Sequence, residues 1–244
     1  MKESKISSRA LLVASVIFVL VLASGPLGYK FGFLLLIPSI ISLLVGVLGG
    51  ILVALSSLIM LFVAIKYKLT VDRNLLLVGS LVSLFPMIFI VPQAFNGLSA
   101  PEINDISTDM NSPPLFGKLL IRQIDNNELS LSEYALSKEE RIKIQNHSYP
   151  ELKTLSSSLD FDSALTRSAA LLRQQGLEIV TIDKDKGIIE AIDTTFWFGF
   201  KDNVVVRLKR HGSGTKVDIR SASRIGLRDF GKNAARIRRF LDDF

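Results

Sequence analysis

The sequence predicts an α+β protein: a three-helix transmembrane module followed by a small domain with an antiparallel β-sheet packed by helices. Residues 10–91 are almost wholly apolar, the composition becomes polar after Pro92, and residues 160–244 show the pattern helix, four short strands, helix. A spanning helix needs about 20 apolar residues, because the hydrocarbon core of a bilayer is about 30 Å thick. The 244-residue chain is long enough for such a module and one globular domain.

Charge is divided unevenly between the two parts. Residues 1–93, the predicted membrane module, hold seven basic and two acidic residues, a balance of +5. The remainder holds 22 basic and 21 acidic residues, so the high pI reflects the membrane part. DNA-binding domains concentrate basic charge in their soluble part, so we expect no nucleic-acid partner. The chain has no cysteine, which excludes disulfides, thiolate metal sites and cysteine nucleophiles.

Three hydrophobic segments predict three membrane crossings, at about residues 10–26, 41–65 and 74–92. The stretch 31–65 is too long for one straight crossing, and Pro38 predicts a break in it, with a short interfacial or re-entrant piece before the spanning helix. Two short spans around Gly49-Gly50 are the alternative. A cleaved signal peptide is disfavoured, because a second hydrophobic run follows the first directly.

The basic residues around these segments predict their orientation. They fall into three groups: Lys2, Lys5 and Arg9 before the first crossing, Lys30 after it, and Lys66, Lys68 and Arg73 after the second. Positive residues stay on the cytoplasmic side. We therefore expect a multi-pass membrane protein with a cytoplasmic N-terminus and the C-terminal domain on the opposite side; in a bacterium this means an inner-membrane protein with a periplasmic domain. No predicted span carries a buried charge, which disfavours transport.

Two further features stand out within the apolar segments. Pro86 predicts a kink in the third crossing. Gly46, Gly49 and Gly50 place small residues in the middle of the second, where they let helices approach closely. Packing within the three-helix module is the first interpretation of these glycines, and a homodimer through them is the second.

The polar part divides into a linker, residues 94–101, and a domain, residues 102–244. Residues 103–109 alternate weakly and are consistent with an extended segment. Ser137 and Glu140 form a capping-box pattern, which predicts a short helix to Gln145.

Residues 160–244 give the clearest pattern. Asp160 or Asp162 can begin a helix that Gly176 ends, because apolar residues between them recur at helical spacing. Four strands and a helix are predicted next, at 178–183, 187–193, 204–209, 216–221 and 229–241. Residues 194–200 either extend the second strand or form a loop. This order favours a sheet with helices on one face.

Several separated motifs carry a resemblance to a known family. They are INDISTD (103–109), Pro113-Pro114-x-Phe116, Tyr149-Pro150, FGF (198–200) before VVVR (204–207), and VDIRSASRIGLRDFGKNAARIRRFL (217–241). Together they resemble the bacterial domain-of-unknown-function family 1499 over nearly the whole soluble part. The resemblance implies an N-terminal three-helix module, as in several members, but no established activity. Lys201-Asp202 departs from the acidic pair expected after FGF.

The strongest polar constellation lies around the last strand and helix: Arg220, Ser221, Ser223, Arg224, Asp229, Asn233 and Arg236. In one interpretation Asp229 caps the helix and the arginines pair with Asp105 and Asp109, holding that segment on the domain. In the other, the arginines and the helix start bind a phosphate or carboxylate. The first is favoured.

A dense aromatic stretch contains Phe196, Trp197, Phe198 and Phe200, and it includes the only tryptophan of the chain. Core packing is the first interpretation. The alternative is an apolar ligand cleft or a contact with the bilayer surface, where Trp is favoured.

No catalytic residue, metal ligand set or cofactor motif is assigned from the sequence. The two histidines, His147 and His211, lie in a polar segment and a predicted turn. We therefore predict a non-enzymatic module that binds an envelope protein or a lipid headgroup next to the bilayer. The alternative is an envelope hydrolase or transferase with Asp105 or Asp109 as base and the arginines as an anion clamp.

Overall fold

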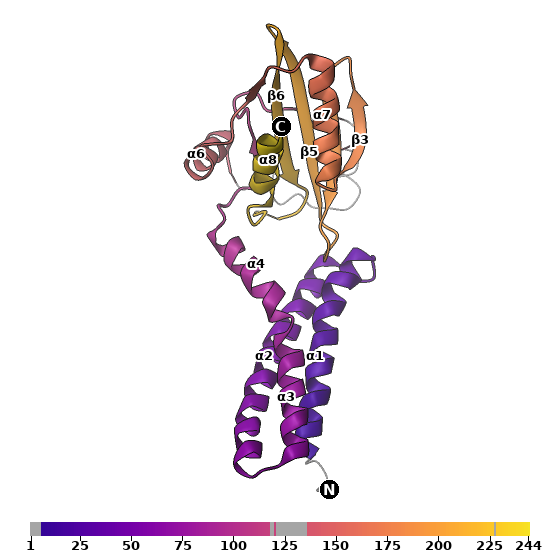
Figure 1. Cartoon of the computed structure of the whole chain (residues 1–244), viewed down its shortest axis with the longest axis vertical. Coiled ribbons are helices and arrows are strands. Elements are labelled where there is room, and N and C mark those ends of the chain that lie inside the picture. Colours follow the sequence, from indigo (N-terminus) through magenta and orange to yellow (C-terminus); the bar gives the residue numbers. More distant parts are fainter. Residues whose placement is uncertain (1–5, 118–119, 121–135, 227) are drawn as a thin grey trace. The chain divides into compact units, whose positions relative to one another are not determined.

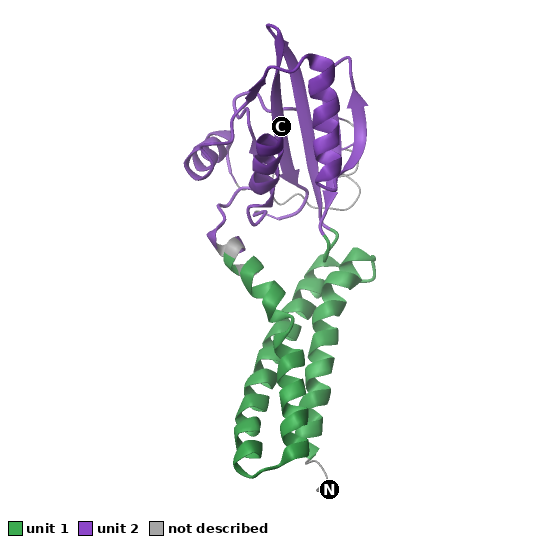
Figure 2. Cartoon of the chain, in the orientation of Figure 1, with its two compact units in different colours: residues 1–95, 196–199 green, residues 96–195, 200–244 purple. Residues whose placement is uncertain are grey.

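A computed structural model describes residues 6–117, 120, 136–226 and 228–244, apart from the side chains of residues 94, 96 and 98. The predicted cytoplasmic residues Lys2 and Lys5 lie outside this part of the chain. The chain forms two compact units, one of residues 1–95 with 196–199 and one of residues 96–195 with 200–244 (Figure 2).

The first unit is built on three long apolar helices (Figure 1): α1 (Ile6–Lys30), α2 (Leu36–Lys66) and α3 (Thr70–Leu84), which is followed by α4 (Met87–Ser99). Three helical stretches are long and apolar enough to cross a membrane: Ile6–Lys30, Leu36–Lys66 and Thr70–Gln93. Lipid offers backbone groups no hydrogen bonds, so segments of this composition satisfy their backbone internally as helices.

The prediction of a break at Pro38 is wrong, because α2 begins at Leu36 and runs unbroken to Lys66. Pro38 therefore lies in the first turn, where a helix leaves its N–H groups without partners and a missing N–H costs little. The same continuity rules out two short spans around Gly49-Gly50. The interfacial piece expected before Pro38 is a tight turn at residues 31–35.

Two other prolines in this unit occupy different positions, one inside a helix and one between two helices. Pro26 lies inside α1, and the hydroxyls of Ser24 and Ser42 both donate to the carbonyl of Val21, just over one turn earlier. Pro86 separates α3 from α4, as the predicted kink requires. Helix α4 continues to Ser99, so most of the segment assigned to the linker is helical.

The glycines of α2 allow α1 and α2 to pack closely. A Cβ added to Gly46 would lie 2.5 Å from the Cα of Leu22, and one added to Gly49 would overlap the Phe18 ring. The first interpretation of these glycines, packing within the module, therefore describes Gly46 and Gly49. A homodimer through the same residues stays a prediction.

One acidic side chain is buried within the helical unit. Asp72, in the first turn of α3, is 5% exposed and accepts a hydrogen bond from the hydroxyl of Ser8 on α1. Asp72 lies outside the predicted span of residues 74–92, and it belongs to the helix because α3 begins at Thr70, four residues earlier than that span. Asp72 lies at the very start of its helix, unlike a charge halfway across the bilayer.

The second unit contains a six-stranded antiparallel sheet in the order β1-β6-β5-β4-β3, with β2 also paired to β6. The strands are β1 (Asp105–Ser107), β2 (Leu155–Ser157), β3 (Glu178–Asp183), β4 (Ile188–Thr194), β5 (Lys201–His211) and β6 (Gly214–Ser223). β1 and β2 follow each other along the outer edge of β6, because β1 pairs with residues 220–222 and β2 with residues 215–217.

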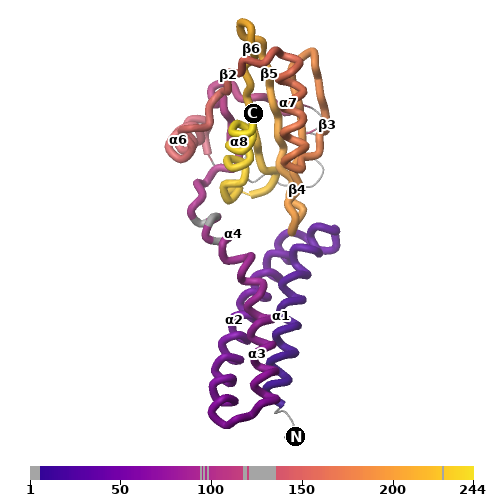
Figure 3. The backbone as a smooth tube through the Cα atoms, viewed as in Figure 1, coloured from indigo at the N-terminus to yellow at the C-terminus, as the bar shows by residue number. Residues whose placement is uncertain are grey.

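Helices α7 (Phe161–Gln174) and α8 (Lys232–Asp243) cover one face of this sheet (Figure 3). The core lies between them and the strands, and it includes Leu172, Val206, Ile219 and Ile237. The α+β fold predicted from the sequence is thus confirmed.

Helix α6 (Lys138–Ser148) lies at the β1 edge and starts with the predicted capping box of Ser137 and Glu140. Its Gln145 side chain accepts from the N–H of Ser107 and donates to the same residue's carbonyl, at 3.1 and 2.7 Å. These bonds satisfy backbone groups that an edge strand would leave open.

Candidate functional site

The residues predicted as one constellation separate onto the two faces of β6. Successive side chains of a strand point to opposite faces. Ser221 therefore faces α8 and donates to Asn233, whereas Arg220 faces away from the helices and binds Asp105. We call the ion-paired residues on or beside this helix-free face the latch cluster: Asp105, Asp109, Arg141, Arg207, Asp218 and Arg220.

Asp105 is the centre of one half of the latch cluster. Arg220 donates from Nε and Nη2 to its two oxygens, each at 2.8 Å, and Arg141 of α6 adds a third contact at 3.2 Å. The side chains of Arg220 and Asp105 are 19% and 17% exposed. Planar two-point contacts of this kind are the stronger class of ion pair.

Arg207 is the centre of the other half. Its Nη2 lies 3.0 Å from Asp109 and 2.7 Å from Asp218, which is its direct neighbour across β5 and β6. Asp218 also accepts from the hydroxyls of Thr108 and Thr154. One guanidinium thus connects the segment after β1 to the sheet.

The chain from residue 105 to 117 lies along this helix-free face. Arg220 contacts the Phe116 ring, 4.6 Å from guanidinium carbon to centroid, and donates to the carbonyl of Pro114 at 3.0 Å. Further along, the Gly117 N–H donates to Glu190, a buried carboxylate of β4. The motifs of this segment are therefore held by side chains of three strands.

On the opposite face Arg236 of α8 is the centre of a second polar cluster. It donates from Nη1 to Ser221 and Asn233, at 2.6 and 2.7 Å, and from Nη2 to Asp193 and to Asp202, the latter at 2.9 Å. The Arg236 and Asp202 side chains are 6% and 5% exposed. A buried guanidinium thus has a buried carboxylate as partner, and neighbouring side chains supply its other hydrogen bonds.

Asn233 connects this cluster to the residues before β1. Its amide donates to the carbonyl of Asn104 at 2.8 Å and to the hydroxyl of Ser223 at 3.1 Å. Its own N–H donates to Asp229 at 2.6 Å, and Asp229 also accepts from the N–H of Gly231. Burial raises the pKa of the Asp229 carboxyl above its ordinary value, although these two hydrogen bonds act in the other direction.

Arg224, predicted as part of the anion site, is buried and lies just beyond β6. Its Nε donates to the side-chain oxygen of Asn203 at 2.9 Å. The three arginines proposed to bind one anion thus have different surroundings, because Arg220 and Arg236 lie on opposite faces of the sheet.

A small groove opens beside Asp105, between the start of α6 and the segment after β1. Its volume is about 90 Å³, and its polar lining includes Asp105, Lys138, Arg141 and Arg220, beside the apolar side chains of Met110, Pro113 and Ile142. We call it the Arg141 groove. The Nε of Arg141 is buried and has no acceptor among the residues that the structure describes. A buried donor without a partner calls for an acceptor from water or a ligand.

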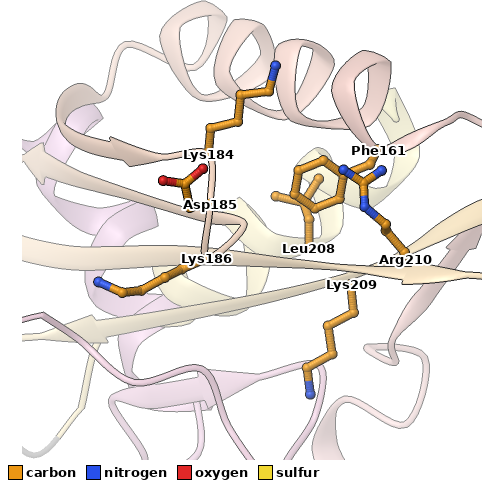
Figure 4. A pocket seen from close by; sticks show the side chains of 7 residues that line it. All are labelled: Phe161, Lys184, Asp185, Lys186, Leu208, Lys209 and Arg210. Carbon is orange, nitrogen blue, oxygen red and sulfur yellow. The ribbon is translucent and has the colours of Figure 1, made fainter.

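A wider recess of about 420 Å³ lies between the start of α7 and the β3–β4 turn (Figure 4). Phe161 and Leu208 form its floor, and Arg210 lies over the Phe161 ring at 4.3 Å. Lys184 and Lys186 pair with Asp162 and Asp183. This recess was not predicted, because in the sequence the basic residues of 184–186 indicate only a turn.

The aromatic stretch lies mostly in the loop between β4 and β5. Phe196 and Trp197 are 76% and 44% exposed, with their rings 5.3 Å apart in an edge-to-face arrangement. Phe198 lies 6.3 Å from the ring of Tyr29. Phe200 is half-buried, and its N–H donates to the hydroxyl of Thr195 at 2.9 Å.

Metal-binding geometry is not found in the described ranges. No group of three His, Asp or Glu side chains there could hold an ion, and His147 and His211 are both at least partly exposed. The paired carboxylates Asp105 and Asp109 bind arginines, as described above.

Comparison with known proteins places the second unit in a family. Residues 105–244, more than half of the chain, match the model of the family described as protein of unknown function (DUF1499). No curated protein and no solved structure matches the chain. The matched region begins at Asp105 and covers the whole sheet, both polar clusters and the Arg141 groove. The chain therefore belongs to the DUF1499 family.

Proposed function

We propose that the C-terminal domain is a non-enzymatic binding module, tethered to the membrane, that takes an acidic group of an envelope component in the Arg141 groove. The buried, unpartnered Nε of Arg141, among the residues described, is the observation that carries the proposal. A small rotation of the Arg141 side chain, which is 40% exposed, would bring this donor to a phosphate or carboxylate oxygen in the groove. The groove has room for one such group and not for a whole lipid or peptide.

The charges of the groove favour an anion. Three cations, Lys138, Arg141 and Arg220, line it together with one carboxylate, Asp105. Lys138 and Arg141 lie on the first turn of α6, where the helix dipole also favours negative charge. The apolar side chains of Met110, Pro113 and Ile142 lie beside these charges, and an apolar surrounding strengthens electrostatic attraction. A phosphate-bearing lipid headgroup is the ligand we favour, because the domain is tethered to a membrane.

The geometry supports the hydrolase alternative less well. A general base must reach a substrate proton at hydrogen-bond distance. The oxygens of Asp105 accept from Arg220 and Arg141, and Asp109 accepts from Arg207 and from the N–H of Ser112. A substrate would have to break these pairs before either carboxylate could act.

The proposed location is a bacterial inner membrane with the domain in the periplasm. Arg9, at the start of α1, and Lys66, Lys68 and Arg73, around the α2–α3 turn, belong to one side in a three-crossing arrangement, whereas Lys30 ends α1 on the other. The positive-inside rule assigns the first group to the cytoplasm. The domain follows the third span and is then periplasmic.

Cysteine labelling tests this topology cleanly, because the chain has no cysteine of its own. In spheroplasts, a membrane-impermeant maleimide should label His211→Cys, at the exposed end of β5, and leave Lys68→Cys unlabelled until the membrane is permeabilised. The reverse pattern would show that the domain is cytoplasmic.

Native mass spectrometry of the full chain, with phosphatidylglycerol and inorganic phosphate as probes, tests the binding site. Arg141→Ala should lose the adduct and stay folded, because Asp105 keeps its contact with Arg220. Arg210→Ala, in the other recess, is the matched control and should keep it. Adducts retained by Arg141→Ala, or seen in neither protein, would contradict an anion site here; an adduct with the lipid alone would identify the headgroup as ligand.

A further inference from the structure

The loop between β4 and β5 holds two large aromatic rings outward in a defined geometry. The Thr195 N–H donates to the carbonyl of Phe200 at 2.8 Å, and Phe200 returns a bond to the Thr195 hydroxyl at 2.9 Å. Gly199 has φ +69°, which allows the chain to turn back. The conformation of the loop therefore fixes the exposure of Phe196 and Trp197.

Leaving such rings in water is unfavourable, at about 25 cal/mol for each Å² of apolar surface. Phe196 and Trp197 lie next to each other on the surface, and Phe196 is among the most exposed large apolar residues of the described chain. Neighbouring exposed aromatic residues indicate a surface that is covered when the protein works.

The residues around this loop indicate what covers it. Residues 196–199 belong to the same compact unit as the apolar helices. Within that unit the Nζ of Lys30 donates to the carbonyl of Phe196 at 2.8 Å and lies 5.1 Å from the centre of its ring. Tyr29, the residue before Lys30, places its ring 6.3 Å from that of Phe198.

Lys30 locates this group of rings relative to the lipid. It is the last residue of α1, a 25-residue helix apolar enough to span a bilayer. A lysine at the end of a spanning helix extends its ammonium group to the headgroup level, where Trp and Tyr are also enriched. A carbonyl and a ring bound to that ammonium lie at the same level.

We infer that Phe196 and Trp197 form an interfacial anchor, inserting into the boundary between the headgroups and the acyl chains of the bilayer that α1 spans. Phe196 supplies an apolar ring. The indole of Trp197 supplies an apolar body and an N–H that can donate to lipid carbonyl or phosphate oxygens. Lys30 adds attraction to lipid phosphate, and Tyr29 adds a further amphipathic ring. The anchor is independent of the Arg141 groove.

Trp197 reports on its own position, because it is the only tryptophan of the chain. The full-length protein is reconstituted into vesicles of phosphatidylglycerol and phosphatidylcholine, with bromine on the acyl chains either near the headgroup or near the bilayer centre. The inference predicts that the shallow bromine quenches Trp197 fluorescence about twofold more than the deep bromine, as for an interfacial side chain. Aqueous iodide should quench it weakly.

Two variants separate anchoring from mere proximity to lipid. Phe196→Ser removes the more exposed of the two rings, so quenching by the shallow bromine should fall and quenching by iodide should rise. Leu115→Ser, at an exposed apolar residue of the other unit, should leave both unchanged. Strong iodide quenching of wild-type Trp197 without quenching by brominated lipid would overturn the anchor, as would equal responses of the two variants.

Discussion

Arg220 binds both carboxylate oxygens of Asp105, from Nε and from Nη2, and both distances are 2.8 Å. The two residues are 115 positions apart in the sequence. Asp105 stands in β1 opposite Ala222, so the pair is diagonal across two adjacent strands. This contact joins the first residue matched by the family model to β6, the last strand in the sequence.

Replacing Arg220 by lysine is expected to destabilise the domain, because an ammonium group cannot make the planar two-point contact with Asp105. We expect the free energy of unfolding to fall by about 1–3 kcal/mol. Thermal unfolding of the full chain in detergent, followed by circular dichroism, measures the change. Arg238→Lys is the control, because Arg238 and Glu151 are both nearly half exposed and such pairs contribute about 0–1 kcal/mol. Equal losses in both variants would contradict a special role for the Asp105 contact.

Removing Arg236 should cost more, because it leaves Asp202, itself buried, without its cation. Breaking a buried pair from one side typically costs about 3–5 kcal/mol, so Arg236→Leu is expected to unfold at a much lower denaturant concentration. The double variant Arg236→Leu/Asp202→Asn removes the uncompensated charge and should recover part of the loss. A double variant less stable than the single one would show that the unpaired charge of Asp202 is not the main cause of the loss.

The glycines of α2 should respond unequally to alanine. Gly46→Ala places a methyl group 2.5 Å from the Leu22 Cα, and forced packing of this kind costs about 1–3 kcal/mol. At Gly50 the nearest atom is the Ser83 carbonyl oxygen at 3.8 Å, so Gly50→Ala should be neutral or stabilise the helix by up to about 1 kcal/mol. Unfolding of both variants in mixed micelles compares them directly. A larger loss of stability in Gly50→Ala than in Gly46→Ala would contradict this arrangement of the helices.

The buried carboxyl of Asp229 should make stability fall as the pH rises. Burial raises its folded-state pKa above 3.8, so the folded protein holds this proton more tightly than the unfolded chain. Its contribution is complete below pH 3.8 and disappears as the pH passes through the raised folded-state pKa. Asp229→Asn should flatten this part of the curve of unfolding free energy against pH. An unchanged slope between pH 3.8 and neutrality would contradict the raised pKa of Asp229.

The elements that the sequence predicted well are marked by residues within or next to the element itself. Asp160 accepts from the N–H groups of Asp162 and Ser163 at the start of α7, and Gly176, at φ +86°, ends it, as expected. The four predicted strands appear as β3 to β6, two of them longer than predicted. The last helix begins three residues late, at Lys232, because Phe230 and Gly231 take positive φ values.

The features that the sequence did not predict depend on contacts between residues that are far apart in the sequence. β2 is three residues long and exists because it pairs with β6, so its own sequence carries little signal. The recess around Phe161 joins the start of α7 to a turn and to β5. The Arg141 groove likewise needs α6 beside β1, and neither segment indicates a groove by itself.

The sequence alone determined the apolar module, the order of strands and helices over residues 160–244, and which residue types cluster near the last strand. These follow from hydrophobicity and from local backbone preferences, which act between near neighbours along the chain. Only the tertiary structure decided that Arg220 and Arg236 lie on opposite faces of one sheet, that Asp105 is held by two arginines, and that α2 is continuous. Those outcomes depend on strand register and on packing between distant segments, where each side chain meets partners that its own neighbourhood in the sequence does not specify.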